Sequence, residues 1–303
     1  MQQIISNITV LEAAPILNLG LLIDGVLIGA IFALAAYGLA MVWGVMNVKN
    51  LAQGDFIMTG GYITWLLGNH GLHPLFALPV ACVVLWCIGW VLYRVVVSKV
   101  ITRDLFTSLL ATFGIAIVIQ QGLNLAFGPD TQSAQADLPT WDVAGGMITI
   151  TATRAIGFGL AALLAIAVIV FMKRSRMGQA IRATAQDARA ARVLGIDTEK
   201  VYSFTFCLNA AICGAAGALV AVVWNVQPFM GTTYSIRLFV VVTAAGFGNL
   251  PGVIAAGFGM GVFEQFGGFI LGAQYQQALV VMLLLIVLGV RQLQNLRLRQ
   301  AVQ

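Results

Sequence analysis

Long apolar runs, separated by short polar breaks, follow one another from residue 19 to residue 290. Most of them reach the roughly 20 residues of helix that cross a hydrocarbon core of about 30 Å. None shows the sustained alternation of apolar and polar positions that is typical of strands. The pattern therefore predicts nine membrane-spanning helices. We place them at 19–46, 51–69, 74–98, 104–127, 153–172, 201–224, 235–249, 252–272 and 274–290.

Two of these runs are unusual and are expected to be broken or re-entrant helices, so the pattern is compatible with about 8–10 passes. Run 51–69 opens on polar residues, and run 235–249 is short. Broken helices in matching positions of two halves are typical of transport sites, although a tight turn between helices would explain the same residues. The predicted break segments contain Gln53 and Gly54 in the first case, and Gly246, Gly248, Pro251 and Gly252 in the second.

Composition narrows the fold class further. Hydrophobic residues make up 60% of the 303 residues and charged residues only 9%, and the mean hydropathy is +0.95. Soluble domains carry about 25% charged residues. In lipid, the backbone polar groups must be satisfied within helices or a closed barrel, and the long continuous runs favour helices. We expect an all-α, polytopic transmembrane bundle that forms one domain over residues 1–303, with no cleavable signal peptide, because residues 1–18 lack a basic segment.

The charges predict the orientation of this bundle. With the N-terminus outside, 14 of the 16 Lys and Arg residues lie on or near the inner side, and only Arg154 and Arg237 lie near the outer side. Because cationic residues accumulate on the cytoplasmic side, this orientation places the C-terminus in the cytoplasm. The outer loop 128–152 contains three aspartates and no Lys or Arg. The net charge of +5 thus reflects membrane orientation and does not indicate a nucleic-acid partner.

The long polar segment on the inner side, residues 173–200, reads KRSRMGQAIRATAQDARAARVLGIDTEK. Its Ala, Arg and Gln residues favour helix, and the pattern predicts one helix from about Gly178 to Leu194. Gly195 is expected to end this helix in the left-handed conformation, and a new helix is expected to start at Asp197 or Thr198.

The end of this predicted helix carries an apolar tip surrounded by charge, formed by Val193, Leu194 and Ile196. Such a tip suits a groove on a partner protein. A surface helix that lies on anionic lipid headgroups is the alternative.

Polar side chains at membrane depth are costly, so each is a candidate for a solute path or an interhelical joint. Thr112, Gln120 and Asn124 share one face of their helix and are predicted to line a path. Glu264 lies in the middle of its run, where it either lines the path or forms an interhelical hydrogen bond. Asp55 is expected to cap the start of its helix.

Enzymatic and metal-binding roles find little support. The four cysteines lie inside apolar runs and are expected to be small buried packing residues. His70 and His73 lie in an outer turn without further ligands, which predicts an exposed loop. No nucleophile, base and orienting group can be assembled, and no phosphate-binding G-x-x-x-x-G-K-[ST] motif occurs.

Several segments resemble one known family. They are SRMGQAIRA (175–183), VLGID (193–197), NLAQGDF (50–56), TFGI (112–115) and FGPD (127–130). Together they are similar to the branched-chain amino acid permeases of bacterial ABC importers, and in particular to the smaller permease subunit of the heterodimeric pair. The resemblance covers most of the chain, from about Gly25 to Leu288.

This resemblance implies a transport subunit in the bacterial inner membrane that binds no cofactor itself. ATP and Mg would bind to separate cytoplasmic ATPase subunits, and the other partners would be a second homologous permease subunit and a periplasmic substrate-binding protein. The loop 173–200 would be the coupling loop that docks on the ATPase. Its contact residues would be Arg182, Asp187, Arg189, Arg192, Leu194, Gly195 and Ile196.

Departures from the family pattern leave the solute open. The family favours His and Glu where this chain has Gln53 and Asp55, and its G-G-x-G-S-x-P-G turn reads AGFGNLPG at 245–252. A P-x-G segment that is common near the C-terminal end is also absent. Relatives in this family carry branched-chain amino acids, other amino acids, urea or short amides. Outside the family, a secondary transporter or channel that works alone is the main alternative, and it would require an intramembrane charge pair or proton relay.

Overall fold

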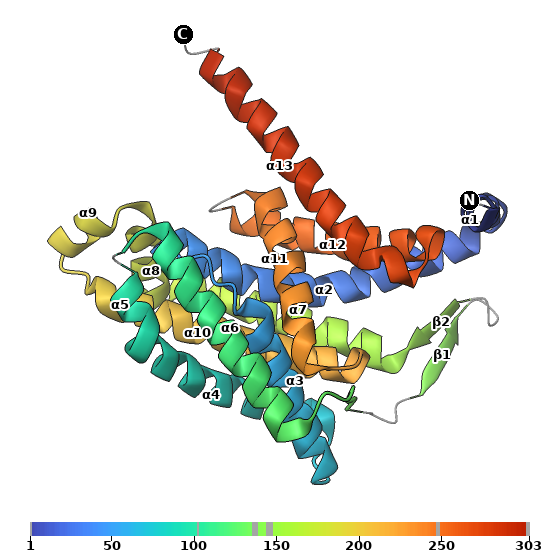
Figure 1. Ribbon diagram of the computed structural model, residues 1–303, viewed down its shortest axis with the longest axis horizontal. Helices are drawn as coiled ribbons and strands as arrows, with labels where there is room; N and C mark the ends of the chain where they lie inside the picture. The colour runs from blue at the N-terminus through green and yellow to red at the C-terminus, as the bar shows by residue number, and fades with distance from the viewer. Residues whose placement is uncertain (1, 102, 135–138, 144–147, 247–248, 301–303) are drawn as a thin grey trace.

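The computed structural model describes residues 2–101, 103–134, 139–143, 148–246 and 249–300 (Figure 1). The helices are α1 (Gln2–Ala13), α2 (Pro15–Met46), α3 (Gln53–Asn69), α4 (Pro74–Leu92), α5 (Ser98–Val100), α6 (Leu105–Phe127), α7 (Ala152–Arg174), α8 (Arg176–Gln186), α9 (Ala188–Val193), α10 (Thr198–Val223), α11 (Gly231–Ala245), α12 (Leu250–Leu271) and α13 (Gln276–Gln300). A π-helical turn, Tyr93–Val97, joins α4 to α5, and 3₁₀ turns occupy Pro228–Met230 and Ala273–Tyr275.

Each of the nine predicted spans coincides with a helix over most of its described residues, and the fold class is confirmed. Among the described residues, seven helical segments are long and apolar enough to cross a membrane. The two spans that fall short are α3, with 17 residues, and α11, with 15 residues, which are the two that the sequence singled out. The helix α11 begins at Gly231 and ends at Ala245, four residues earlier at each end than predicted. It ends at Ala245 because Gly246 has a φ of +96°, which is incompatible with a right-handed helix.

A small β-hairpin departs from the all-α prediction. Strand β1 (Thr140–Val143) pairs antiparallel with β2 (Ile148–Thr151), with Thr140 opposite Thr151. Threonine, valine and isoleucine suit strands, but two four-residue strands are too short to produce a recognisable alternation. The hairpin lies at the end of the bundle opposite α8 and α9 (Figure 1).

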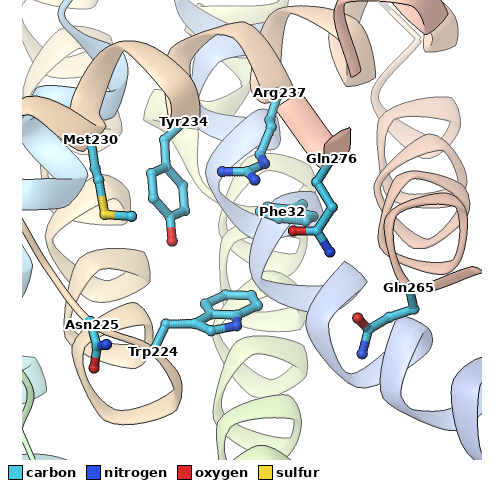
Figure 2. Close-up of a pocket in the computed structure, with 8 residues that line it drawn as sticks. All are labelled: Phe32, Trp224, Asn225, Met230, Tyr234, Arg237, Gln265 and Gln276. Carbon is cyan, nitrogen blue, oxygen red and sulfur yellow. The ribbon is translucent and has the colours of Figure 1, made fainter. Parts of the chain in front are cut away.

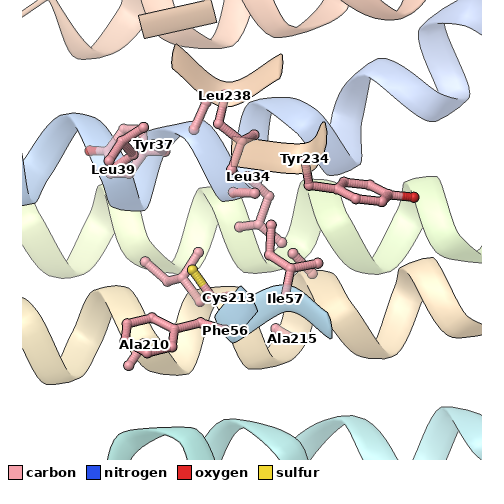
Figure 3. Close-up of a cluster of buried hydrophobic side chains, with 14 of the residues drawn as sticks. Leu34, Tyr37, Leu39, Phe56, Ile57, Ala210, Cys213, Ala215, Tyr234 and Leu238 are labelled. Carbon is pink, nitrogen blue, oxygen red and sulfur yellow. The ribbon is translucent and has the colours of Figure 1, made fainter. Parts of the chain in front are cut away.

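Helices α2 and α10 run through the centre of the bundle, and α4, α3 and α12 pack against them. The buried cluster in Figure 3 joins Leu34 and Leu39 of α2 to Phe56 of α3 and Leu238 of α11. By contrast, α6 and α7 lie at the periphery, and α13 projects away from the bundle (Figure 1). On α6, Val118 is 72% exposed and Leu125 is 90% exposed, as expected for side chains in contact with lipid.

Glycines allow the closest helix contacts. A Cβ on Gly29 of α2 would lie 2.7 Å from the Cα of Phe258 on α12, and one on Gly257 would lie 2.5 Å from the Cα of Ala33. Either distance is too short for a side chain, so both helices need glycine here. Small residues at such positions bring backbones together, which is how helices associate in lipid.

Two names are used below for the ends of the bundle. The basic end holds residues 47–52, 101, 103–104, 175–197, 246 and 249, and the hairpin end holds residues 70–73, 128–134, 139–143, 148–151, 224–230 and 272–275.

Candidate functional site

The break between α2 and α3 at the basic end is held together by buried amide groups. Asn47 ends α2 in the left-handed conformation, with a φ of 52°. Gln53 then starts α3, fully buried, and pairs reciprocally with Asn209 of α10: Nε2 donates to Oδ1 at 2.8 Å, and Asn209 Nδ2 donates to Oε1 at 2.9 Å. Gln53 also donates to the carbonyl of Ala35 on α2 at 3.2 Å. A connection between two separate helices therefore lies at the predicted residues, and Gln53 ties three helices together beside it.

Gly54, the second residue of this predicted break, lies where α3 contacts α11. Its N–H donates to Ser235 Oγ at 2.8 Å, and that hydroxyl donates to the carbonyl of Leu51 at 2.9 Å. A Cβ on Gly54 would overlap the carbonyl oxygen of Gly231. The two short helices therefore meet backbone to backbone at this point.

Asp55 does not cap α3 as predicted. Position Ala52 is the N-cap, so the carboxylate of Asp55 already lies inside the first turn. It is buried and instead accepts a hydrogen bond from Gln120 Nε2 of α6 at 2.9 Å, and the same nitrogen reaches Thr232 Oγ1 of α11 at 3.2 Å. The polar contacts thus link α3, α6 and α11.

The predicted stripe on α6 faces the protein, but its members have separate surroundings. Thr112 is fully buried and donates to the carbonyl of Lys49 at 3.1 Å, within the break after α2. Gln120 contacts Asp55 and Thr232. Asn124 is half-buried, and its Oδ1 finds no hydrogen-bond partner among the described residues.

Glu264 of α12 is ion-paired with a residue of α11. Its Oε1 lies 2.5 Å from Nε of Arg237 on α11. The guanidinium also stacks against aromatic rings, with Cζ at 5.2 Å from the centroid of Tyr234 and 5.9 Å from that of Phe32. The sequence shows both residues but not their pairing, because Arg237 reads from sequence as an outer-side charge.

A cavity of about 240 Å³ adjoins this pair. Figure 2 shows Arg237 and Tyr234 pointing from α11 toward Trp224 and Phe32. The cavity is lined by residues of α2, of the segment between α10 and α11, of α11 and α12, and of the start of α13. They are Phe32, Trp224, Asn225, Met230, Tyr234, Arg237, Gln265 and Gln276. It combines apolar walls with one cation and three amides, which is a composition typical of small-molecule sites.

The second predicted break, between α11 and α12, is a capped turn. Gly246 follows the last residue of α11 and has a φ of +96°, which ends the helix. Asn249 then caps α12, and its Oδ1 accepts a hydrogen bond from the N–H of Gly252 at 3.1 Å. Pro251 lies in the first turn of α12, where a backbone N–H has no partner within the helix, so the N–H that proline lacks is not missed. Gly248 lies outside the described residues.

The segment 175–197 differs from prediction in one respect: it forms two helices. Asp187 adopts an extended conformation (φ −154°, ψ 107°) that ends α8 and caps α9, and its Oδ1 accepts from the N–H groups of Arg189 at 2.7 Å and Ala190 at 3.0 Å. These backbone hydrogen bonds hold the pKa of Asp187 below its usual range. The sequence did not predict this cap, because the flanking alanines have a high helix propensity and favour one continuous helix.

The end of this segment matches prediction. Gly195 has a φ of +84°, and Asp197 caps α10 by accepting the N–H of Lys200 at 3.2 Å. Val193 is 87% exposed and Leu194 is 80% exposed, so the apolar tip exists, with Ile196 partly buried behind it.

Two contacts anchor the helix α8 to the end of α7. The guanidinium of Arg182 donates to the carbonyl of Met172. Gly178 packs against the Met172 backbone so closely that a Cβ would lie 2.6 Å from its Cα. Arg189 and Arg192 are exposed on α9.

The remaining candidates are partly corrected. Cys207 and Cys213 are buried as predicted, but Cys87 is exposed on the outside of α4. His70 and His73 are exposed, and Nδ1 of His73 accepts the N–H of Leu75 at the start of α4 at 3.3 Å. No cluster of three or more metal-ligating side chains occurs in the part of the chain that the structure describes.

A bundle of membrane-spanning helices with polar breaks, a cavity lined by aromatic and polar side chains and an exposed helical loop is consistent with a multi-pass membrane transport protein. The family model described as "Branched-chain amino acid transport system / permease component" matches residues 21–288, and the chain belongs to this family. It is a transport permease component and not an enzyme, and ATP hydrolysis in this family is carried out by separate ATPase subunits.

Three relatives illustrate the similarity. The chain is 29% identical over 283 residues to the high-affinity branched-chain amino acid transport system permease protein LivH of Salmonella typhimurium, covering 88% of this chain and 91% of the relative. It is 28% identical to BraD of Pseudomonas aeruginosa, which has the same description, over 88% and 92%. It is 25% identical to a probable branched-chain amino acid transport permease protein of Methanocaldococcus jannaschii, over 86% and 85%. No solved structure gives a significant match.

Proposed function

We propose that this chain is the permease subunit of an ATP-driven importer for branched-chain amino acids. The observation that carries the proposal is the family match over residues 21–288, together with relatives that are named as branched-chain amino acid permeases and are covered over most of their length. The partners in this proposal are two ATPase subunits that bind ATP and Mg, a second homologous permease subunit and a periplasmic substrate-binding protein.

The proposed location is the bacterial inner membrane, with the basic end and the C-terminus in the cytoplasm. The bias of 14 of the 16 Lys and Arg residues toward this end supports that orientation. It brings the exposed tip of Val193 and Leu194 to the side where ATP is available.

The loop 173–200 is the proposed ATPase contact. Its tip exposes two large apolar side chains next to Arg189 and Arg192, and it suits an apolar groove with an acidic rim. The loop is anchored at both ends: Arg182 holds it to α7, and the cap of Asp197 leads directly into α10. A push on the tip would therefore reach α10, which packs against α2, α3 and α4 in the centre of the bundle.

A two-state mechanism follows from this arrangement. Closure of the ATPase subunits would shift the loop and the attached ends of α7 and α10, and the short helices α3 and α11 would follow through their contacts with the core. ATP binding then biases an equilibrium between inward-open and outward-open packings of the same helices.

A transporter that works alone remains the second candidate, because the ion pair of Arg237 and Glu264 is the kind of intramembrane charge pair that it requires. The two candidates differ in a simple assay. Proteoliposomes that contain the permease alone should take up leucine only under the second candidate, whereas the importer needs the ATPase subunits, the binding protein and ATP.

The docking role is tested with Leu194→Glu, which places a charge at the apolar tip. We expect the ATPase subunits to co-purify with the wild type and to be largely lost from the variant, with membrane insertion unchanged. His70→Glu adds the same charge at the hairpin end and should leave co-purification intact. Full retention of the ATPase by Leu194→Glu would contradict the proposed contact.

A further inference from the structure

The cavity beside α11 holds an arginine in an unusual setting. Arg237 is largely buried, with 15% of its side chain exposed, and its bond to Glu264 uses Nε alone. The two terminal nitrogens of the guanidinium form no hydrogen bond to any described residue. A guanidinium presents a planar fork of donors that fits a carboxylate bidentately, and this fork lies in the lining of the cavity.

We propose that Arg237 binds the carboxylate of an α-amino acid solute in this cavity, with Glu264 holding the guanidinium in position. The inference rests on the proposed importer function and assigns a solute subsite within the permease itself. Glu264 is a positioning residue here. It neutralises the buried arginine when no solute is present, because an unpaired charge away from water is costly.

The rest of the lining suits the other parts of such a solute. The amide oxygens of Asn225, Gln265 and Gln276 can accept hydrogen bonds from an ammonium group. The rings of Phe32 and Trp224, stacked with centroids 6.0 Å apart, give an apolar wall for an aliphatic side chain. A volume of about 240 Å³ lies below the roughly 300–1,000 Å³ of pockets for drug-sized ligands, so the cavity fits a small solute.

The subsite also separates solute classes. Urea and short amides carry no carboxylate, so they would leave the terminal nitrogens of Arg237 without their bidentate partner. A site built to bind a carboxylate holds analogues that lack it less tightly, because the terminal nitrogens then lose a charge-assisted, bidentate partner. The geometry therefore favours amino acids over neutral amides.

The test measures direct binding of leucine and of leucinamide, which lacks the carboxylate. The permease is purified with its partner subunits in nanodiscs, without the binding protein, so that the specificity of that protein does not enter. We expect the wild type to prefer leucine by roughly ten- to a hundredfold, the range of one charge-assisted hydrogen-bond pair. Arg237→Gln should abolish this preference, and Arg237→Lys should restore part of it.

A double variant protects the test against misfolding. Arg237→Gln with Glu264→Gln removes both charges, so neither is left buried and unpaired, and it should also lose the preference. The matched control is Arg154→Gln with Asp24→Asn, which removes a second arginine–aspartate pair, a 2.7 Å contact between α7 and α2. The control should keep the preference for leucine.

Each outcome has a distinct meaning. A preference that survives in the Arg237→Gln single and double variants would overturn the subsite, as would a wild-type permease that shows no saturable leucine binding. An equal loss of leucine and leucinamide binding in these variants, with the ratio unchanged, would show a structural role only and would also overturn it. If the wild-type complex lacks ATP-driven leucine uptake, the proposed function itself fails, independently of these ratios.

Discussion

Three pairs of polar side chains inside this bundle bind one another across helices. Gln53 pairs with Asn209, Asp55 with Gln120, and Glu264 with Arg237. Lipid offers no water to satisfy an amide or a carboxylate, so each such residue needs a partner on another helix. These pairs join α3 to α10, α3 to α6, and α11 to α12. Separating the two helices of any pair would leave buried polar groups without hydrogen bonds, which costs free energy.

The pair of Gln53 and Asn209 leads to a prediction about stability. Gln53→Leu should lower the free energy of unfolding by about 1–3 kcal/mol, because the amide of Asn209 loses both of its reciprocal bonds inside the core. Gln53→Leu with Asn209→Leu should cost less than the sum of the two single variants. Interhelical hydrogen bonds in membranes are worth about 1–2 kcal/mol in model peptides and less in one natural protein, so we expect a coupling energy of about 1 kcal/mol.

Reversible unfolding in mixed micelles measures these free energies. Gln179→Leu, an exposed change on α8, should stay within about 0.5 kcal/mol of the wild type. Strict additivity of the Gln53 and Asn209 changes would mean that the pair contributes nothing beyond its separate members.

At this scale, the sequence identifies the polar residues but not their partners. Gln53, Gln120 and Glu264 stand out because each interrupts an apolar run, and each proves to make a polar contact within the bundle. Asn209 and Arg237 were not connected to them, since the pairing depends on how helices that are far apart in sequence pack. The predicted cap by Asp55 was wrong because α3 begins at Gln53, so Asp55 already lies within the first turn and its carboxylate accepts a hydrogen bond from Gln120 on α6.

At the scale of elements, a single residue, Asp187, divides the loop between α7 and α10 into two helices. Without the cap of Asp187, the segment from Arg176 to Val193 has the composition of one continuous helix, which is what its alanines and arginines predict. The extended conformation of Asp187 divides it, and the division determines where Val193 and Leu194 point. The sequence therefore predicts the helical content and the stop at Gly195 correctly, and misses the angle between α8 and α9.

Asp187→Ala tests this division. Removing the side-chain acceptor should destabilise the start of α9, because the N–H groups of Arg189 and Ala190 lose their cap, and should favour fusion of α8 and α9 into one helix. The distance between spin labels at Gln179 and Arg192 should then shift toward that of a continuous helix, with a rise of about 1.5 Å per residue. ATPase stimulation should fall because the tip is displaced.

Asp187→Asn serves as the control, because asparagine caps as well as aspartate does, and the label distance should not change.

The pH dependence of the loop's stability has a definite sign. Since backbone hydrogen bonds lower the pKa of Asp187 in the folded loop, the charged cap stabilises the loop above the ordinary aspartate pKa, and this contribution is lost as the pH falls through the lowered value. An unchanged label distance in Asp187→Ala would contradict the role of the cap.

For the whole molecule, the distribution of exposed apolar side chains and charges defines a protein with two different ends and a lipid-facing belt. The belt is formed largely by α4, α6, α7 and α13, whose outer faces expose large aliphatic and aromatic residues. Composition alone predicts this class, because no soluble fold hides so much apolar surface. The order of packing, with α2 and α10 central, could not be predicted, since the central and peripheral helices are about equally apolar.

The last prediction concerns the side of the membrane that each end faces. Cationic residues resist translocation across the membrane, and the basic end carries nearly all of them, so we expect this end in the cytoplasm. In a variant whose native cysteines are replaced, His70→Cys at the hairpin end should react with a membrane-impermeant thiol reagent in intact cells. Arg192→Cys at the basic end should react only after the membrane is permeabilised, because its exposed side chain lies on the opposite side. Labelling of Arg192→Cys in intact cells, with His70→Cys protected, would contradict this orientation. It would place the loop outside the cytoplasm, where it could not contact an ATPase that uses cytoplasmic ATP.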